Sequence, residues 1–367
     1  MNIKLFGIDR QYLTLREEIL EATDKIYLSG QALDGQSTKD FESAIANYTN
    51  RKYAITVNSC TQALMISVST VVYKQYNKIL VPAVSFAASA NAIKLAGGVP
   101  VFCDVDPVTG LIDINKINVP LSEISGILYV NLLGNIINYD KLISDISLFS
   151  TQRITIIEDA AQSFGASYNN IKSGKLGNIS CLSFDPTKNF NNYGSGGMIL
   201  TDSYEVHGLA SDFKNHGKNY HHQIVGSNSK MNEADCAQML IKFKYFEKWQ
   251  QRRTEIAEYY NQMFKDYVND IQLIPTTDNV THARSKYMIH VNDPENTSMV
   301  LKDKFNIESK VNYPYPLNTY DAFIQEPYHE LSNARKFCET HLNIPIYPEL
   351  TDLEVEYIAK SVINTVT

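Results

Sequence analysis

The sequence predicts an α/β fold, with a mostly parallel central sheet in a large first domain and a smaller C-terminal α+β domain. Helical and strand patterns alternate through the first part of the chain, which is typical of parallel strands joined by crossover helices. At 367 residues the chain is about twice the usual domain size, so we expect two domains. We place them at residues 1–240, including an N-terminal helix, and at residues 241–367.

The elements of the first domain follow from the spacing of apolar residues. Leu15, Ile19 and Ile26 lie on one face of a helix that we expect to end at Ser29-Gly30, and a second helix follows Thr38. The remaining elements that the pattern predicts are strands at 53–57, 78–81, 99–103, 126–130 and 154–157 and helices at 63–72, 87–95 and 139–149.

Two closely spaced strands, at 181–184 and 197–201, are joined by a Gly-rich segment and predict a meander rather than a crossover. A long helical region over 232–267 then leads into the second domain. There we expect strands at 287–291 and 309–313 and helices at 297–305 and 353–366. The last helix begins with Thr351 and Glu354, the spacing of a capping box.

Composition excludes several classes of protein. The chain has 33 basic and 40 acidic residues and no long basic run, so we expect no nucleic-acid partner. Five scattered cysteines without a C-x-x-C pair predict neither a disulfide framework nor a structural zinc site, and they fit a reducing cytoplasm. The first ten residues lack a signal-type apolar stretch, and no run of about 20 apolar residues occurs. We therefore expect neither export nor a membrane span.

Ligands of open parallel sheets bind at the carboxyl ends of the strands, so polar residues that follow apolar runs are candidates. Ser59, Cys60 and Thr61 separate a strand from a helix, and the free amides of a helix N-terminus suit a phosphate. An ordinary N-cap by Ser59 or Thr61 is the alternative interpretation.

An acidic pair, Glu158 and Asp159, follows the strand at 154–157. Burying such a pair costs free energy unless a cation or a proton donor meets it, which indicates a ligand. Helix capping by Asp159 is the alternative. Lys188 follows a later strand and is flanked by Phe184 and Phe190. Partial desolvation there would lower the pKa of its amine and prepare it for Schiff-base chemistry, unless it is an ordinary solvated loop lysine.

Three weaker signals complete the candidates. Phe86 follows a strand end, where an aromatic ring either stacks on a planar ligand or joins the core. Asp104 and Asp106 resemble the metal-binding Asp-x-Asp of nucleotide-sugar glycosyltransferases, or else begin a turn. The Gly-rich segment at 194–197 indicates unusual backbone dihedrals. No His-x-x-x-His or His-Glu-x-x-His spacing supports a zinc site, and we expect no metal.

The ordered set of these motifs resembles the DegT-type family of pyridoxal 5′-phosphate (PLP) dependent nucleotide-sugar aminotransferases. The resemblance covers the chain nearly end to end. The segments that carry it include Val81-Pro82-Ala83-Val84-Ser85-Phe86, Glu158-Asp159-Ala160-Ala161-Gln162, Ser183-Phe184-Asp185-Pro186-Thr187-Lys188-Asn189, Asn215-His216-Gly217 and Tyr313-Pro314-Tyr315-Pro316-Leu317. It implies the aspartate aminotransferase fold (fold type I), with PLP bound by the large domain.

The resemblance also implies roles for individual residues. Lys188 would bond covalently to PLP and then move the proton, and Asp159 would pair with the pyridine nitrogen. Gln162 would lie near the ring hydroxyl, and Phe86 would stack on the ring. The residues implied to hold the phosphate are Ser59, Cys60, Thr61 and Ser183, with Asn228 reaching the site of the neighbouring subunit in a homodimer. Those implied to contact the sugar are Ser29, Asn312 and Tyr313.

The implied reaction moves an amino group from L-glutamate to a 3-keto or 4-keto deoxysugar linked to a nucleotide diphosphate. Lys188 favours transamination, because the sugar 3-deoxygenase members of the family carry histidine there. Asp185 and Asn312 stand where histidines are common. Two other hypotheses are a metal-dependent glycosyltransferase that uses Asp104 and Asp106, and a catalytically silent PLP-binding regulator.

Overall fold

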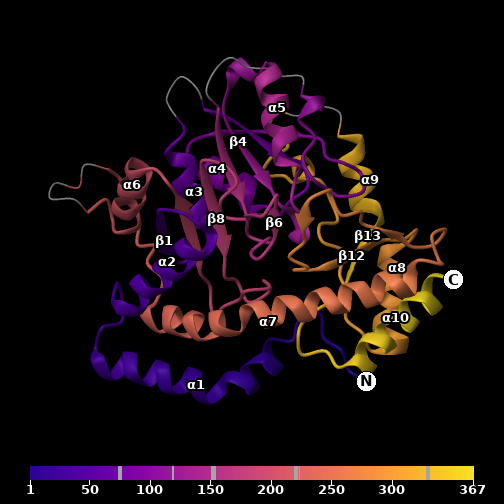
Figure 1. The fold of residues 1–367 in the computed structure, drawn as a ribbon. Coiled ribbons are helices and arrows are strands. Elements are labelled where there is room, and N and C mark those ends of the chain that lie inside the picture. Colours follow the sequence, from indigo (N-terminus) through magenta and orange to yellow (C-terminus); the bar gives the residue numbers. More distant parts are fainter. Residues whose placement is uncertain (73–76, 118–119, 150–153, 219–221, 223, 328–330) are drawn as a thin grey trace.

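A seven-stranded sheet forms the centre of the first part of the chain in the computed structural model, which describes residues 1–72, 77–117, 120–149, 154–218, 222, 224–327 and 331–367 (Figure 1). The strands lie in the order β1-β9-β8-β5-β4-β2-β3, and the five from β8 to β3 pair in parallel. Their bounds are β1 (Tyr53–Val57), β2 (Lys78–Pro82), β3 (Val99–Cys103), β4 (Ile124–Val130), β5 (Thr155–Asp159), β8 (Ile179–Ser183) and β9 (Gly197–Thr201). The mostly parallel α/β sheet is therefore confirmed.

Strand β9 runs antiparallel to both of its neighbours, β8 and β1, which confirms the predicted meander. Every residue of β8 and β9 is buried. Strands of this kind lie in sheets whose two faces are both covered by helices.

The helices of the first part are α1 (Ile8–Ser29), α2 (Gln36–Thr49), α3 (Cys60–Ser69), α4 (Ala88–Leu95), α5 (Tyr139–Phe149), α6 (Tyr204–Lys214) and α7 (Glu233–Phe264). Helix α1 lies along α7, and α2 also contacts α7 (Figure 1). As predicted, α1 ends at Gly30, whose φ of 72° places it in the left-handed region that glycine tolerates. Short 3₁₀ turns occur at Ile114–Lys116, Leu121–Glu123, Leu132–Gly134 and Leu317–Thr319.

Helix α2 begins at Gln36, before the predicted start at Thr38. The buried carboxylate of Glu233, at the start of α7, accepts hydrogen bonds from the backbone N–H groups of Gly35, Ser37 and Thr38. Thr38 lies inside the helix, and its hydroxyl also donates to Glu233. The first amides of α2 are therefore satisfied by a residue far away in the sequence, which no local pattern reveals.

The second part of the chain contains a three-stranded antiparallel sheet, in the order β10-β12-β13. Its elements are β10 (Gln272–Leu273), β12 (Tyr287–His290), β13 (His341–Ile344), α8 (Pro294–Phe305), α9 (Ser332–Thr340) and α10 (Asp352–Val366). The predicted strand at 309–313 is wrong, because only Lys310 forms an isolated bridge, to Asn343. Pro314 and Pro316 follow and have no N–H to donate to a ladder. The Thr351–Glu354 capping box is confirmed.

A small third sheet joins the two parts. It pairs β11 (Val280–Thr281) with β6 (Ser167–Tyr168), which in turn pairs with β7 (Ile171–Lys172). Within the described residues, no helix has both the length and the apolar character needed to cross a bilayer.

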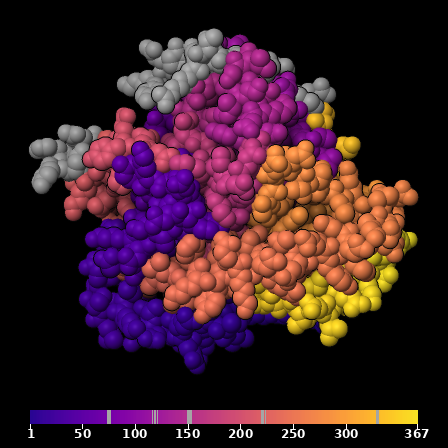
Figure 2. Space-filling view, viewed as in Figure 1, coloured from indigo at the N-terminus to yellow at the C-terminus, as the bar shows by residue number. Residues whose placement is uncertain are grey.

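Two large hydrophobic cores lie in the two parts of the chain, and the longest described helix, α7, contributes to the second. The first surrounds the seven-stranded sheet and includes Ile127 and Leu128. The second packs Tyr260 of α7 against Ile289 and Ile358. Figure 2 shows the N-terminal residues, in indigo, next to α7 on the surface of the molecule. The predicted domain boundary after residue 240 falls inside α7 and stays a prediction.

The end of β5 is fixed by a buried polar cluster. Glu158 is fully buried, and its carboxylate accepts hydrogen bonds from Asn131, Ser173, Ser180 and the N–H of Gly174. Ser180 also accepts from Arg51 at 3.0 Å. Burial raises the pKa of Glu158, and the bonds from Ser180 and Ser173 oppose that shift. Donors from the protein thus satisfy the first of the two predicted acidic residues, so it needs no ligand.

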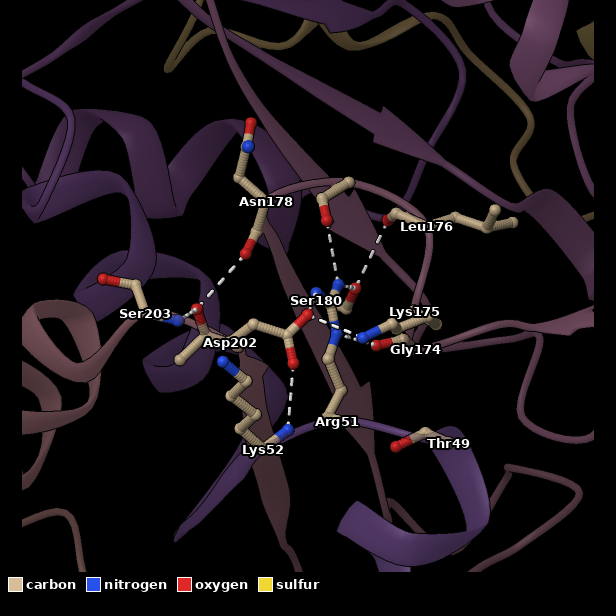
Figure 3. Close-up of polar contacts among 12 residues, drawn as sticks. Thr49, Arg51, Lys52, Gly174, Lys175, Leu176, Asn178, Ser180, Asp202 and Ser203 are labelled. Atoms are coloured by element: carbon tan, nitrogen blue, oxygen red, sulfur yellow. Dashed lines mark hydrogen bonds and ion pairs between the residues drawn. The ribbon is translucent and has the colours of Figure 1, made fainter.

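Arg51 contacts the same cluster through Gly174 and Ser180 (Figure 3). Its guanidinium donates to the carbonyls of Gly174 and Gly177 and to the carboxylate of Asp202. The substitution Arg51→Met removes the guanidinium donor from the carbonyls of Gly174 and Gly177 and one of the donors to Asp202, so we expect unfolding by urea to require about 3 kcal/mol less free energy. Lys52→Met is the control, because the exposed neighbour contributes only its backbone N–H to Asp202. Equal stability of the two variants would contradict this account.

Candidate active site

A cavity of about 470 Å³ opens at the carboxyl edge of the seven-stranded sheet, where the residues that follow β1, β2, β5 and β8 meet. Residues of the second part of the chain close its other side. The predicted site residues that line it are Ser59, Cys60, Thr61, Phe86, Asp159, Gln162, Ser183, Lys188, Asn312 and Tyr313. Two predicted residues do not line it. Ser29 is exposed at the end of α1, and Asn228 is exposed in a bridge to Asn215.

Asp159 faces this cavity, whereas its neighbour Glu158 faces the buried cluster, because successive side chains of a strand point to opposite faces. The carboxylate of Asp159 is only 4% exposed. It accepts hydrogen bonds from the Ser89 hydroxyl at 2.8 Å and the Ala161 N–H at 3.1 Å. Burial raises the pKa of Asp159, and the nearby charge of Lys188 opposes the shift. Among the described residues it has no salt bridge, so it can accept a cationic N–H from a ligand.

Lys188 lies in the tight loop after β8, on the wall of the same cavity. Its backbone N–H donates to the carbonyl of Asp185, whose carboxylate accepts from the N–H of Thr187. The flanking Phe184 and Phe190 are fully buried and anchor the loop in the core. The lysine side chain is half-buried, which agrees with the predicted partial desolvation.

The N-terminus of α3 borders the cavity beside Ser183. Ser59 caps the helix by accepting from the N–H of Gln62 at 3.2 Å, so the N-cap interpretation is right. The amides of Cys60 and Thr61 belong to the first turn and have no acceptor within the helix, so they stay available to an anion. Burial raises the pKa of the Cys60 thiol well above its usual value, which makes it an unreactive wall residue.

The glycines at 194–197 do not have left-handed backbone dihedrals, and Gly197 allows two segments to pack closely. Gly194, Gly196 and Gly197 are absent from the described residues with positive φ, which corrects the sequence-based expectation. A Cβ on Gly197 would lie 2.5 Å from the carbonyl carbon of Ser59 and 2.6 Å from the amide nitrogen of Cys60. Only glycine lets β9 approach the start of α3 this closely.

Gln162, Tyr313 and Phe86 also line the cavity. The amide oxygen of Gln162 accepts from the Leu133 N–H at 3.0 Å, which fixes the amide so that its nitrogen donates to the Tyr313 hydroxyl at 3.2 Å. The rings of Tyr313 and Phe86 lie 6.1 Å apart between centroids. Burial raises the pKa of Tyr313, so it keeps its phenolic proton.

The carboxylates of Asp104 and Asp106 accept hydrogen bonds from backbone N–H groups. The fully buried Asp104 accepts from the N–H of Ala334 at 2.8 Å, at the start of α9. Asp106 accepts from the N–H groups of Val108 and Thr109, so the turn interpretation fits. In the described part of the chain, no group of three His, Cys, Asp or Glu residues is placed to hold a metal ion.

Sequence reasoning missed several residues that line the cavity, notably Ser89, Phe6, Lys286 and Lys310. Ser89 had a local signal, because it lies one turn after Ser85 and the two hydroxyls are 2.8 Å apart. Phe6, Lys286 and Lys310 gave none, since they come from the N-terminal segment and the second part of the chain.

The donor set fits PLP. A buried carboxylate that forms no salt bridge with the described residues suits a protonated pyridine nitrogen, a half-buried amine in the same cavity suits an aldehyde, and a free helix N-terminus suits a phosphate. Fold and site together define a PLP-dependent enzyme of fold type I.

The chain belongs to the DegT/DnrJ/EryC1/StrS aminotransferase family, whose sequence profile matches residues 13–363. It is therefore a PLP-dependent sugar aminotransferase. A protein of Geobacillus stearothermophilus named "Pleiotropic regulatory protein" is 30% identical over 99% of this chain and 98% of its own. UDP-2-acetamido-2-deoxy-3-oxo-D-glucuronate aminotransferase of Pseudomonas aeruginosa is 27% identical over 99% and 100%. S. venezuelae DesV, solved in complex with a ketimine intermediate, has a TM-score of 0.91 and 25% identity over 99% and 98%.

Proposed function

We propose that the enzyme transfers the amino group of L-glutamate to a keto-deoxysugar linked to a nucleotide diphosphate, at a 3-keto or 4-keto carbon. The observation that best supports this proposal is that Lys188 and Asp159 line one cavity beside the free N-terminus of α3. The P. aeruginosa relative is named for a UDP-linked 3-oxo sugar, which supports this class of acceptor.

Lys188 and Asp159 would carry the chemistry. PLP, when bound, supplies an aldehyde that takes up the amino group and a ring that accepts electron density. The Lys188 amine would bond to that aldehyde, give way to the substrate amine, and then carry the proton between the substrate Cα and cofactor C4′. The buried carboxylate of Asp159 would keep the ring nitrogen protonated.

The other cavity residues would bind and orient. The amides of Cys60 and Thr61, with Ser59 and the Ser183 hydroxyl, would hold the phosphate. Phe86 would cover the ring face, and the fixed amide of Gln162 would meet the ring hydroxyl. Asn312 and Tyr313 would contact the sugar. Ser29 lies outside the cavity of its own chain, so any sugar contact by this residue would have to be made in the cavity of a second subunit.

The test is a panel of dTDP-, UDP- and GDP-linked 3-keto and 4-keto sugars, each incubated with L-glutamate and PLP-loaded enzyme. We expect release of 2-oxoglutarate with at least one acceptor and formation of the matching amino sugar by mass spectrometry. No 2-oxoglutarate with any of them would overturn the proposal. If no 2-oxoglutarate forms although PLP is bound, the result would favour the catalytically silent regulator. The name of the G. stearothermophilus relative supports that alternative.

The glycosyltransferase hypothesis receives little support. The carboxylates of Asp104 and Asp106 accept hydrogen bonds from backbone amides of α9 and of their own turn. That hypothesis also leaves Lys188 and Asp159 without a role. It predicts sugar transfer that depends on Mn²⁺ and is abolished by changing either aspartate.

The proposed assembly is a homodimer whose active sites are shared. Asn228 is exposed and does not line the cavity of its own chain, which fits a residue that reaches the phosphate site of a partner subunit. We expect Asn228→Ala and Lys188→Ala, each poorly active alone, to regain up to about a quarter of wild-type activity when co-expressed, because one mixed site then carries neither change. Co-expression of two copies of the Lys188→Ala chain is the control, because no mixed site then contains Lys188. Absence of recovery would contradict a shared site.

Close packing at Gly197 should be needed for cofactor binding. In Gly197→Ala the new Cβ must push the start of α3 away from β9, so we expect PLP affinity to fall at least about tenfold. Gly194→Ala in the same segment is the control, because its Cβ meets nothing closer than 3.5 Å. Equilibrium dialysis of PLP against both variants measures the difference. Equal affinity in the two would show that the approach of α3 does not matter.

We place the reaction in the cytoplasm. None of the five cysteines forms a disulfide and all are buried, which is typical of a protein kept in a reducing compartment. Fractionation of the native host with an antibody against this chain tests the location, and recovery from the culture medium would contradict it.

A further inference from the structure

The proposed reaction leaves two cationic side chains of the cavity unused. Lys286 immediately precedes β12, and Lys310 lies in the segment that leads to Asn312. Both line the cavity together with Lys188, but both come from the second part of the chain. The side of the cavity away from the seven-stranded sheet therefore carries positive charge.

Both lysines lie next to the small antiparallel sheet, although neither belongs to one of its strands. Lys310 exchanges backbone hydrogen bonds with Asn343, at 3.0 and 2.9 Å. The next residue, Ile344, pairs with Tyr287, the neighbour of Lys286. Lys310 therefore lies beside β13, Lys286 precedes the strand on the other side of β13, and both lysines line the cavity.

Lys286 forms no salt bridge with the residues that the structure describes. Its side chain is half-buried, and its ammonium lies 4.5 Å from the ring centroid of Phe6. Burial, and then the charges of Lys188, Arg253 and Lys310, lower the pKa of Lys286 to about 7, whereas Asp185 opposes the shift. A partly buried cation beside other cations costs free energy because like charges repel, and a bound oxoanion offsets that cost.

We propose that Lys286 and Lys310 bind a carboxylate or phosphate group of a substrate on the side of the cavity away from the sheet. This inference rests on the proposed function only for the identity of the substrates. Two substrates carry such groups: the amino donor has carboxylates, and the acceptor has a diphosphate. The chemistry of recognition is the same for both, and two probes separate them.

The probes are glutarate, an unreactive dicarboxylate, and inorganic pyrophosphate, each titrated calorimetrically into PLP-loaded enzyme, so that the cofactor phosphate site is already filled. We expect wild type to bind at least one probe. We expect Lys286→Met and Lys310→Met each to weaken the binding of that probe at least about tenfold. A loss for glutarate assigns the lysines to the amino donor, and a loss for pyrophosphate assigns them to the acceptor.

Lys304→Met is the matched control, because it removes the same charge from an exposed position on α8 outside the cavity. The thermal midpoint of Lys286→Met should not fall, since the change removes an unpaired cation and keeps its apolar stem. The proposal is overturned if wild type binds neither probe, if only one of the two lysines matters, or if Lys304→Met weakens binding as much. A negative keto-sugar panel would leave these binding results intact, so the two proposals fail separately.

Discussion

Replacing Lys188 by alanine is expected to lower kcat for transamination about 10³-fold or more and to abolish the visible absorbance band of the PLP-loaded enzyme. The substitution removes both the amine that bonds to the cofactor aldehyde and the group that carries the proton between the substrate and the cofactor. The fold should survive, because Lys188 is half-buried and its loop is held by Phe184 and Phe190. Spectra and initial rates of 2-oxoglutarate release measure the two effects.

Lys175→Ala is the control for this experiment. That lysine pairs with Asp202, away from the cavity, so its loss should leave both the band and kcat unchanged. A Lys188→Ala enzyme that keeps the band and turns over within about tenfold of wild type would remove the basis for the proposed chemistry.

The second large effect is expected for Asp159→Asn, which should lower kcat about 10²- to 10³-fold. The amide is close in size to the carboxylate but lacks the charge that would hold a proton on the ring nitrogen, so developing negative charge in the transition state loses its stabilisation. PLP should still bind through the α3 N-terminus and Ser183. Single-turnover rates with L-glutamate separate this chemical defect from a binding defect.

Asp185→Asn serves as the matched control for Asp159→Asn, because this carboxylate also lines the cavity but accepts from Thr187 in its own turn. We expect its kcat to stay within about tenfold of wild type. Equal losses in the two variants would mean that overall charge, and not contact with the ring nitrogen, determines the rate.

Much of the site was predictable because the rule behind it is local. Ser59, Asp159 and Lys188 each follow an apolar strand, and parallel strands end at one edge of a sheet whatever their order. The same reasoning explains why the β8–β9 meander was predictable, since two short apolar runs close in sequence pair directly.

What could not be predicted depends on contacts between distant segments. Glu158 and Asp159 look alike in sequence, and only the position of Arg51 and the loop around Gly174 decides which of them faces the cavity. The start of α2 depends on Glu233 in the same way. Lys286 and Lys310 carry no local signal, because they come from the second part of the chain, far in sequence from the strand ends that line the cavity.

The most direct test of this account is borohydride reduction of the PLP-loaded enzyme, followed by mass mapping of its peptides. Reduction makes the bond between a lysine nitrogen and PLP permanent, so the tag marks the lysine that carries the cofactor. We predict a single pyridoxyl tag on the peptide that contains Lys188. A tag on Lys286, the other half-buried lysine of the cavity, or no tag at all would contradict the central claim.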